Sequence, residues 1–382
     1  MIIAGAQVYR YRLPLREPVV LKGNTYRERE GLLLCLRDDA GREGWGESAP
    51  LAGFSRESLE AAEAALRHCA ARLRGYRLPD HYDDLEGSGL LQTHGVQSVS
   101  FAIEAAYYNL LALTRGVLPC TCINFDAPGH ITLNALLLGE PRAVIAQAAR
   151  ATAEGYGAVK LKVGARSIDE EVELVHAVRD TLGPAVGLRL DANRAWPLDT
   201  AVAFGRRVAD CNIEYIEEPL RDPVALPDFE RRTQVPYALD ETLQTWQALQ
   251  QPPEADSRER FAMDAYQRAL NRVYSRAAAC VWKPTLMHVP NLVAAIAWGM
   301  FFPMKKIVLS AAFESGVGIA ALVNYAAAYS GAETPVGLDT YAWLGEDVLA
   351  SRLPLDQAHV DVTTVTAAAR FVRREALTPR DE

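Results

Sequence analysis

The pattern of hydrophobic and polar positions changes near residue 130 of this chain. Residues 1 to about 50 alternate in the manner of antiparallel strands, with a turn at 38–41. Two helices are predicted next, one capped by Ser55 and one over about 98–113, where apolar residues recur at helical spacing. From Ile131 onward, amphipathic stretches separate eight strand-like segments, at 131–136, 159–163, 188–193, 215–219, 237–241, 280–284, 306–310 and 336–339.

Alternating strands and helices predict a parallel sheet, and eight such units predict closure into a barrel of the α/β class. Five of the segments end in a lysine or a carboxylate, at Lys162, Asp191, Glu217, Asp240 and Lys283. The first four lie 29, 26 and 23 residues apart, close to the roughly 25 residues that one barrel unit needs. Because active sites of such barrels lie at the C-terminal ends of the strands, these groups are predicted to meet on one rim.

Three acids on that rim form a candidate metal site. Asp191, Glu217 and Asp240 each end a predicted buried strand, where a carboxylate is costly unless it is paired or binds a metal. An ion pair or a helix cap would explain any one of them alone. Three acids on successive strands would repel one another without a cation, and three oxygen ligands with open positions suit Mg²⁺, with Mn²⁺ as a substitute.

Lysines flank these acids. Lys160 and Lys162 stand at i and i+2, so both point to one face of their strand, either into the barrel or onto a solvated edge. Burial and a neighbouring positive charge are expected to lower a lysine pKa from about 10.4 toward the range of about 7 to 8, where an amine acts as a base. Lys283 ends the sixth strand, across the barrel. A metal between opposed amines favours proton abstraction next to a carboxylate, through an enediolate.

The composition is that of a globular protein and argues against nucleic acid as a partner. The 382 residues are 49% hydrophobic and 23% charged, with a net charge of −8 and no long basic block. No run of about 18 apolar residues predicts a membrane span. The first ten residues lack the pattern of a signal peptide, and the six scattered cysteines lack zinc-ligand spacing, so we expect reduced thiols in a cytoplasmic protein.

Three regions are predicted along the chain. Residues 1–125 form an N-terminal α+β capping domain, 126–341 the catalytic barrel, and 342–382 a segment that returns to the capping domain. The step from Asp240 to Lys283 is 43 residues, and the usual step is about 25. Its polar excess, 247–278, predicts a helix or loop inserted on the surface.

The chain resembles the enolase superfamily and, within it, the o-succinylbenzoate synthases of menaquinone biosynthesis. The lysine-x-lysine pair, the three acids and the late lysine carry the resemblance to the superfamily. The branch is indicated by the stretch 188–196 and by Lys283-Pro284-Thr285-Leu286, together with 44–51 and 53–55. The resemblance implies a modified TIM barrel of the enolase type, (β/α)₇β, with an α+β capping domain.

The same resemblance implies a role for each residue. Lys162 abstracts a proton and can return it to the departing hydroxyl, Lys160 assists it, and Lys283 stabilises the enediolate from the opposite face. The three acids hold Mg²⁺. The small carboxylate substrate would be 2-succinyl-6-hydroxy-2,4-cyclohexadiene-1-carboxylate, which loses water by syn elimination to give o-succinylbenzoate. Further substrate contacts are implied at Asn193, Ser310 and Glu314.

Two departures from the family pattern concern the substrate. The insertion after Asp240 is not part of that pattern, and Met287-His288-Val289 stands where small residues are usual. How the succinyl tail is held therefore stays open. His288 is either a substrate ligand or a surface-loop residue, and Trp45-Gly46-Glu47 either touches substrate or forms a structural turn.

Two other functions compete with this one. N-succinylamino acid racemases and dipeptide epimerases of the same superfamily use lysines on both faces as two bases, and the motifs separate them weakly from the synthases. A binding protein on a degenerate barrel would have lost a lysine or a metal ligand, and none is missing here. The sequence leaves the oligomeric state open.

Overall fold

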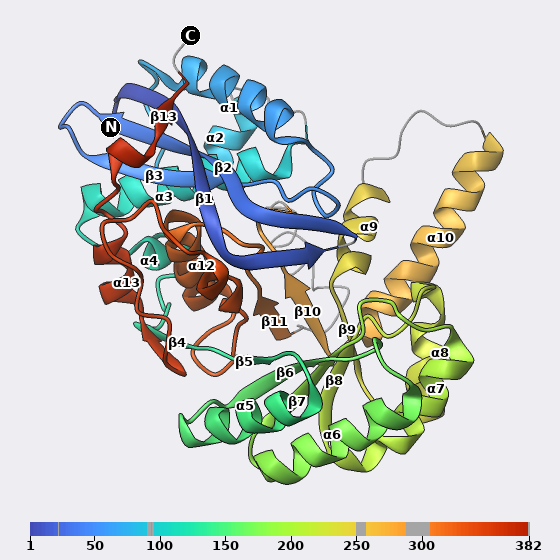
Figure 1. Ribbon diagram of the computed structural model, residues 1–382. Helices are drawn as coiled ribbons and strands as arrows, with labels where there is room; N and C mark the ends of the chain where they lie inside the picture. Colours follow the sequence, from blue (N-terminus) through green and yellow to red (C-terminus); the bar gives the residue numbers. More distant parts are fainter. Residues whose placement is uncertain (22, 90–92, 94, 250–256, 288–305, 381–382) are drawn as a thin grey trace.

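The computed structural model describes residues 1–21, 23–89, 93, 95–249, 257–287 and 306–380, arranged as a capping sheet with its helices above a parallel barrel (Figure 1). The capping sheet has the order β13-β1-β2-β3, and the barrel sheet the order β5-β6-β7-β8-β9-β10-β11. This arrangement confirms the predicted α/β architecture. Within the described residues, no helix combines the length and the apolar character needed to cross a membrane.

The capping region contains β1 (Ile3–Leu21), β2 (Asn24–Asp38), β3 (Glu43–Ser48), α1 (Leu59–Leu73), α2 (Tyr82–Gly87), α3 (Gln97–Arg115) and α4 (Pro119–Ile123). The barrel strands are β5 (Ala135–Leu137), β6 (Ala158–Lys162), β7 (Gly187–Asp191), β8 (Ile213–Glu217), β9 (Tyr237–Leu239), β10 (Ala279–Trp282) and β11 (Lys306–Leu309), preceded by the short strand β4 (His130–Thr132), which is not part of the barrel sheet. The barrel helices are α5 (Pro141–Ala153), α6 (Ile168–Leu182), α7 (Leu198–Arg207), α8 (Leu226–Thr233), α9 (Glu241–Leu249), α10 (Ser257–Arg276) and α12 (Gly316–Tyr329). The last part of the chain adds β12 (His359–Asp361), α13 (Val362–Ala368) and β13 (Thr378–Pro379), and short 3₁₀ turns include η1 (Ala209–Cys211) and η4 (Asp339–Trp343).

The capping sheet is buried on both faces, and this explains why its middle strand is continuously apolar. In β2, Leu32, Leu34 and Leu36 pack with helices α1 and α3, while Leu33 and Cys35 belong to the cluster that continues into the barrel. The simple alternation expected for a sheet with one wet face therefore fails here. The strand instead joins the two hydrophobic cores of the molecule.

Strand β3 lies unusually close to helix α3, and glycine makes this approach possible. A Cβ added at Gly46 would lie 1.9 Å from the carbonyl oxygen of Ala102 on the helix. We expect Gly46→Ala to destabilise the protein by about 1 to 3 kcal/mol, the usual cost of overpacking, because backbone atoms would have to move. Denaturant unfolding measures the change. Gly87→Ala is the matched control, since a Cβ there meets nothing within 4 Å, and an equal loss in both variants would contradict the explanation.

The eighth predicted barrel strand is reduced to two bridges that close the ring. Val336 pairs in parallel with Leu133, and Gly337 pairs in parallel with Ser310 at the end of β11. The amide of Asn134 also donates to the carbonyl of Val336 at 2.9 Å. The carboxyl ends of all eight segments therefore meet on one side of the barrel, where the predicted site residues lie.

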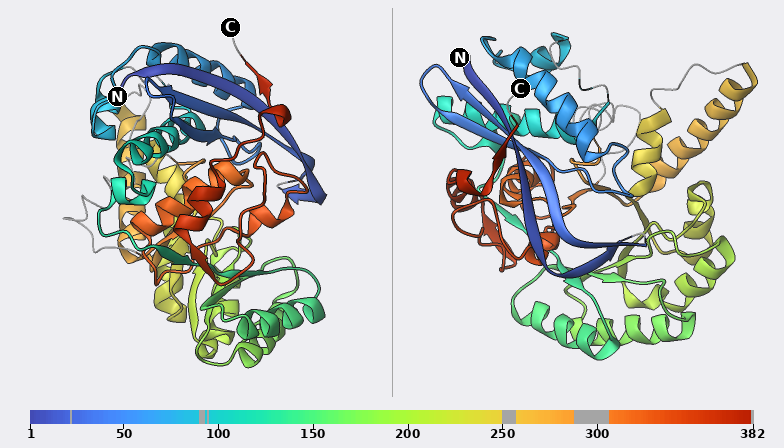
Figure 2. Two further views of the ribbon diagram at one scale, coloured as in Figure 1. Left: turned by 90° about the vertical axis from the view of Figure 1, so that its left-hand side faces the viewer. Right: turned by 45° about the horizontal axis from the view of Figure 1, so that its top comes forward.

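The final part of the chain contacts both regions of the molecule. Strand β12 pairs with β4 beside the barrel, and β13 pairs with β1 at the edge of the capping sheet. Figure 2 shows the red C-terminal strand against the blue N-terminal one. The domain boundaries at 125 and 341 stay a prediction.

Two local predictions need correction. Ser58, rather than Ser55, caps helix α1, and the Ser55 hydroxyl instead accepts a hydrogen bond from the amide of Leu51. The segment 247–278 is also not simply a surface insertion, because Val273 and Tyr274 of helix α10 are buried in the barrel core. The C-terminal half of α10 thus acts as a barrel helix, while its other end projects from the molecule (Figures 1 and 2).

Candidate active site

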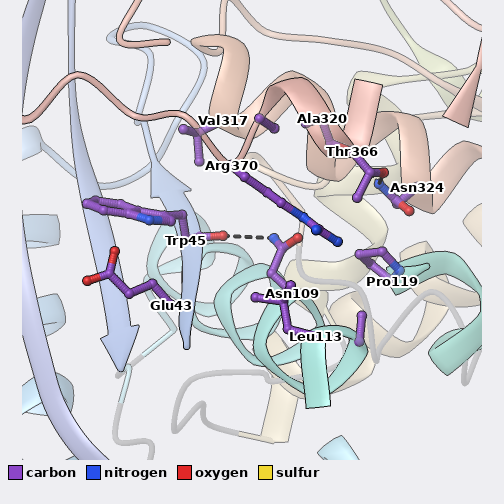
Figure 3. Close-up of a pocket in the computed structure, with 12 residues that line it drawn as sticks. Glu43, Trp45, Asn109, Leu113, Pro119, Val317, Ala320, Asn324, Thr366 and Arg370 are labelled. Atoms are coloured by element: carbon purple, nitrogen blue, oxygen red, sulfur yellow. Dashed lines mark hydrogen bonds between the residues drawn. The ribbon is translucent and has the colours of Figure 1, made fainter. Parts of the chain in front are cut away.

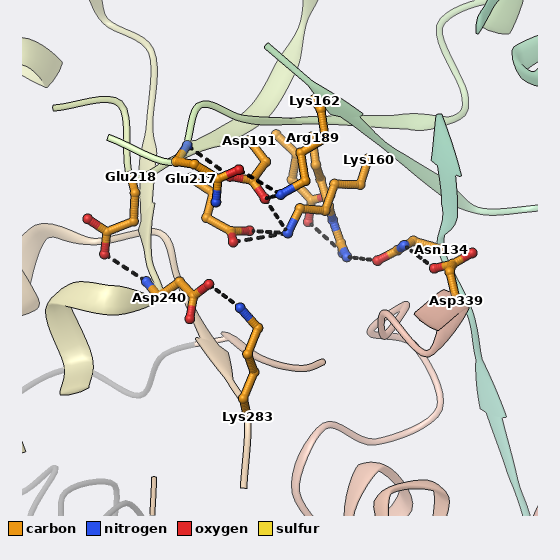
Figure 4. A network of polar contacts seen from close by, with 12 residues as sticks. Asn134, Lys160, Lys162, Arg189, Asp191, Glu217, Glu218, Asp240, Lys283 and Asp339 are labelled. Atoms are coloured by element: carbon orange, nitrogen blue, oxygen red, sulfur yellow. Dashed lines mark hydrogen bonds and ion pairs between the residues drawn. The ribbon is translucent and has the colours of Figure 1, made fainter. Parts of the chain in front are cut away.

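Strand β6 places two lysines on the rim of the barrel, as predicted. Lys160 Nζ lies 2.8 Å from Asp191 Oδ2 and 2.9 Å from Glu217 Oε1. Lys162 Nζ lies 2.6 Å from Asp191 Oδ2 and 2.8 Å from Asn193 Oδ1. Lys160 is the more deeply buried of the two, and the Lys162 side chain is 40% exposed on the cavity side (Figure 4).

The three predicted acids converge on adjacent strands. Lys162 is opposite Asp191 in the sheet register, and Asp191 is opposite Glu217 on β8. Asp240 follows β9, and Lys283 Nζ from the far side of the site contacts its Oδ2. All three carboxylates are almost fully buried. The structure therefore brings together the six charged residues that the strand ends predicted.

These carboxylates fit a hard divalent cation. Burial, reinforced by Asp191, raises the pKa of Glu217 to about 8, so a second negative charge is poorly tolerated there. Burial opposes ionisation of Asp191 too, but Lys160 and Lys162 hold its pKa well below its usual range. Glu217 Oε2 lies 2.8 Å from Lys160 Nζ and has no further hydrogen-bond partner among the described residues. Buried, converging oxygen ligands of this kind are those that Mg²⁺ prefers.

The predicted lowering of the lysine pKa is wrong for two of the lysines in this arrangement. Burial does disfavour the ammonium of Lys160, but Asp191 and Glu217 outweigh it and hold its pKa well above the ordinary value. Burial is outweighed at Lys283 as well, where Asp240 and Glu217 raise the pKa. The predicted lowering took the neighbouring amine into account but not the carboxylates, which the fold places in contact with these lysines. A metal bound to these carboxylates would neutralise the negative charge that raises the pKa of both lysines.

Glu218 holds the backbone around Asp240 in place through hydrogen bonds. The buried carboxylate of Glu218 accepts hydrogen bonds from the amides of Asp240 and Thr242, at 2.9 and 2.7 Å. Its other oxygen accepts from Arg194 at 3.0 Å. Glu218, Arg194 and Asn193 all have positive φ angles, of 42°, 61° and 42°, which is uncommon outside glycine. Backbone strain therefore gathers beside the metal-site carboxylates, as is common at functional sites.

A polar chain runs from the cavity into the barrel interior. Asn134 lies 3.4 Å from Asp339 and accepts a hydrogen bond from the fully buried Arg189 at 3.3 Å. Arg189 also donates to Glu214 at 2.7 Å, and Lys306 pairs with Glu214 from the other end of the barrel. Burial raises the pKa of Asp339 to about 6. Sequence reasoning missed Asn134 and Asp339, although Asn134 lies within the first predicted barrel strand and Asp339 ends the last one.

The residues Lys160, Lys162, Asp191 and Lys283 line a cavity of about 590 Å³, a size that suits a small organic substrate. The capping region covers it with apolar residues, and the barrel contributes the charged and polar ones together with further apolar side chains. From the cap come Val19, Val20, Leu51 and Phe54; from the barrel come Asn134, Lys160, Lys162, Asp191, Asn193, Lys283, Ser310, Phe313 and Asp339. A second cavity between β3 and α12, beside Trp45 and Asn109, holds only about 30 Å³ (Figure 3).

Two candidate contacts lie away from the main cavity. Glu314 is fully buried, accepts a hydrogen bond from Thr285 at 2.6 Å and does not line the cavity. Glu47 is also fully buried and accepts from the amide of Ser315 at 2.9 Å, which fastens β3 to the start of α12. The structural interpretation of the Trp45–Glu47 motif is thus favoured. Ser310 and Asn193 do line the cavity, and His288 lies outside the described residues.

Comparisons with known proteins agree with this architecture. Residues 3–109 match the family model "MenC, N-terminal domain", and 143–282 match "Enolase C-terminal domain-like". The o-succinylbenzoate synthase of Salmonella dublin is 33% identical over 88% of this chain and 90% of its own length. Protein PHYLLO of Arabidopsis thaliana, a chloroplastic protein, is 29% identical over 92% of this chain, which spans only 22% of PHYLLO.

Among solved structures, the L-Ala-D/L-Glu epimerase of Bacillus subtilis aligns with a TM-score of 0.75 at 23% identity, over 94% of this chain and 96% of its own. At that identity the likeness shows the fold alone. Enzymes of the enolase superfamily act on small molecules and bind a divalent metal, typically Mg²⁺. The family models and the 33% identity to a curated synthase go further: the chain belongs to the MenC (o-succinylbenzoate synthase) family of the enolase superfamily.

Proposed function

We propose that this protein is an o-succinylbenzoate synthase. It would remove water from 2-succinyl-6-hydroxy-2,4-cyclohexadiene-1-carboxylate, in menaquinone biosynthesis and in the cytoplasm. The observation that carries the proposal is the pair of opposed amines around the buried carboxylates, with Lys160 and Lys162 on β6 and Lys283 beyond β10. This arrangement suits removal of a proton next to a carboxylate, and the family to which the chain belongs includes curated synthases.

In the proposed mechanism, Asp191, Glu217 and Asp240 would hold Mg²⁺, which when bound stabilises negative charge on the substrate carboxylate. Lys162, as the neutral amine, takes the proton from the carbon beside that carboxylate. The hydroxyl then leaves from the same face with that proton as water, so Lys162 returns to the neutral amine. Lys283 places positive charge against the opposite face. Because the product is aromatic, catalysis mainly requires stabilisation of one carbanion.

A racemase or epimerase of N-acylated amino acids or dipeptides is the second candidate. Lysines on both faces of the cavity favour it, because Lys162 and Lys283 could then act as two bases. The structural likeness to an epimerase concerns the fold and does not decide between the reactions. In a syn elimination only one of the lysines needs to exchange a proton with the substrate, whereas a racemase needs both.

Proton exchange in D₂O distinguishes the two functions. We expect rapid formation of o-succinylbenzoate from the cyclohexadiene, and no exchange of the α-proton of an N-succinylamino acid, followed by NMR with Mg²⁺ present. The same enzyme preparation serves as the control for both substrates. Exchange with racemisation at the efficiency of the elimination would make the racemase activity primary or equal, and would overturn an exclusive synthase assignment.

A further inference from the structure

A cluster of three potential metal ligands lies on the outside of the barrel, remote from the cavity. His176 on helix α6 faces Asp210 and Cys211 of turn η1, and one ligand atom from each lies within 4.8 Å of the others. Turn η1 precedes β8, so the cluster belongs to the barrel end opposite the C-terminal rim that carries the candidate active site. Motif spacing does not reveal this cluster, because 35 residues separate the histidine from the cysteine.

The histidine is oriented as a metal ligand would be. His176 Nε2 lies 3.0 Å from the carbonyl oxygen of Arg207, which can only accept, so Nε2 carries the hydrogen. The neutral ring then presents the lone pair of Nδ1 to Cys211 Sγ, at 3.4 Å. Metal-binding histidines nearly always donate their other ring N–H to a carbonyl or carboxylate in this way, which fixes the tautomer.

The spacing of the ligand atoms fits zinc. A tetrahedral ion with Zn–S of about 2.3 Å and Zn–N of about 2.0 Å holds these two atoms about 3.5 Å apart. The observed distance from Nδ1 to Sγ is 3.4 Å, and Sγ lies 3.8 Å from Asp210 Oδ1. A small rotation of the exposed Asp210 side chain would complete three ligands, with the fourth position left to water.

Turn η1 is held in place by contacts that do not involve the ligand atoms. Arg179 donates to the carbonyl oxygens of Cys211 and Asn212, at 2.7 and 3.1 Å. It also donates to the carbonyl oxygen of Gly183. Asn212 takes the left-handed conformation at φ 46° that turns the chain into β8. The cysteine is thus presented by a fixed backbone, which lowers the entropy lost when a metal binds.

From these contacts we propose that His176, Asp210 and Cys211 form a zinc-binding site that joins helix α6 to turn η1. Burial, followed by the charge of Asp210, raises the pKa of the Cys211 thiol to about 11, so the thiol holds its proton when no metal is bound. Zinc would replace that proton, which is released to solvent as the thiolate bonds to the metal. A thiolate, an imidazole and a carboxylate together favour Zn²⁺ over Mg²⁺.

The test uses the intact protein with saturating Mg²⁺, which occupies the all-oxygen site in the barrel. Calorimetric titration with Zn²⁺ is expected to show that each chain binds one equivalent of zinc in addition to the Mg²⁺. Co²⁺ in place of zinc is expected to give a thiolate-to-cobalt absorption band, which carboxylate ligands alone do not produce. His176→Ala and Cys211→Ser should abolish that band and weaken zinc binding by more than about 100-fold, because loss of a contact that only supports a ligand already costs about 10 to 100-fold.

Asp210→Asn separates a ligand role from a folding defect, because this exposed side chain can change without disturbing the core. It should weaken zinc binding while the thermal unfolding of the metal-free protein stays unchanged. Cys122→Ser is the matched control and should bind zinc normally. No additional equivalent in the wild type, a normal cobalt band in Cys211→Ser, or equal binding by all four variants would overturn the proposal.

Discussion

Lys162→Ala is expected to lower turnover of the cyclohexadiene substrate by about 10² to 10⁴-fold, the usual range for loss of a general acid–base group. The Lys162 amine lies in the cavity against Asp191 and Asn193, and its side chain is 40% exposed. Truncation therefore removes the amine that we propose as the base without opening the buried core. Steady-state kinetics measure the loss, and thermal unfolding checks that the fold is intact.

Lys306→Ala is the matched control for that substitution. Lys306 has nearly the same exposure, 42%, and an acidic partner in Glu214, but it stands at the opposite end of the barrel. Its loss should leave turnover close to that of the wild type. If Lys162→Ala also retained near-normal turnover, the base would have to be another group, and Lys283 would be the next to test.

Removal of divalent metal is expected to abolish turnover, and Mg²⁺ or Mn²⁺ should restore it. The buried acids Asp191, Glu217 and Asp240 are the reason, because together they supply the oxygen ligands that Mg²⁺ prefers. Asp191→Asn removes one charge from this set. It should weaken Mg²⁺ binding by about 10 to 100-fold or more, since even partners behind a metal ligand contribute that much.

Calorimetry of Mg²⁺ or Mn²⁺ binding measures the change in metal affinity directly, without an activity assay. Glu214→Gln is the control, because Glu214 lies on the same strand as Glu217 but pairs with Arg189 and Lys306 away from the site. Its metal affinity should match the wild type. Full activity after thorough chelation, or unchanged metal affinity in Asp191→Asn, would remove the metal site from the mechanism.

The charged part of the site could be predicted from the sequence because one geometric rule determines it. In a parallel barrel every strand ends on the same rim, so the numbering of Lys162, Asp191, Glu217 and Asp240 already places them together. This rule does not determine the distances between the side chains on the rim. Lys160 and Lys283 each contact buried carboxylates directly, which is why the predicted direction of the pKa shift failed at both.

The apolar part of the site could not be predicted in this way. Val19, Leu51 and Phe54 reach the cavity because the capping sheet packs over the barrel rim, and that packing depends on contacts between distant segments. Glu314 shows the opposite case. The family resemblance implied a substrate contact there, yet Thr285 holds its carboxylate inside the protein.

The pairing of β13 with β1 has a consequence for how the chain reaches this fold. Tyr9 and Arg10 gain their outer strand partners only at Pro379 and Thr378, so the edge of the capping sheet stays open while the barrel is being synthesised. Arg374, which lies over the rings of Tyr9 and Trp45, arrives equally late. A ribosome-bound chain therefore exposes an unpaired strand edge for most of its synthesis, and such edges invite pairing with other chains. Shielding β1 during that interval is therefore expected to reduce aggregation.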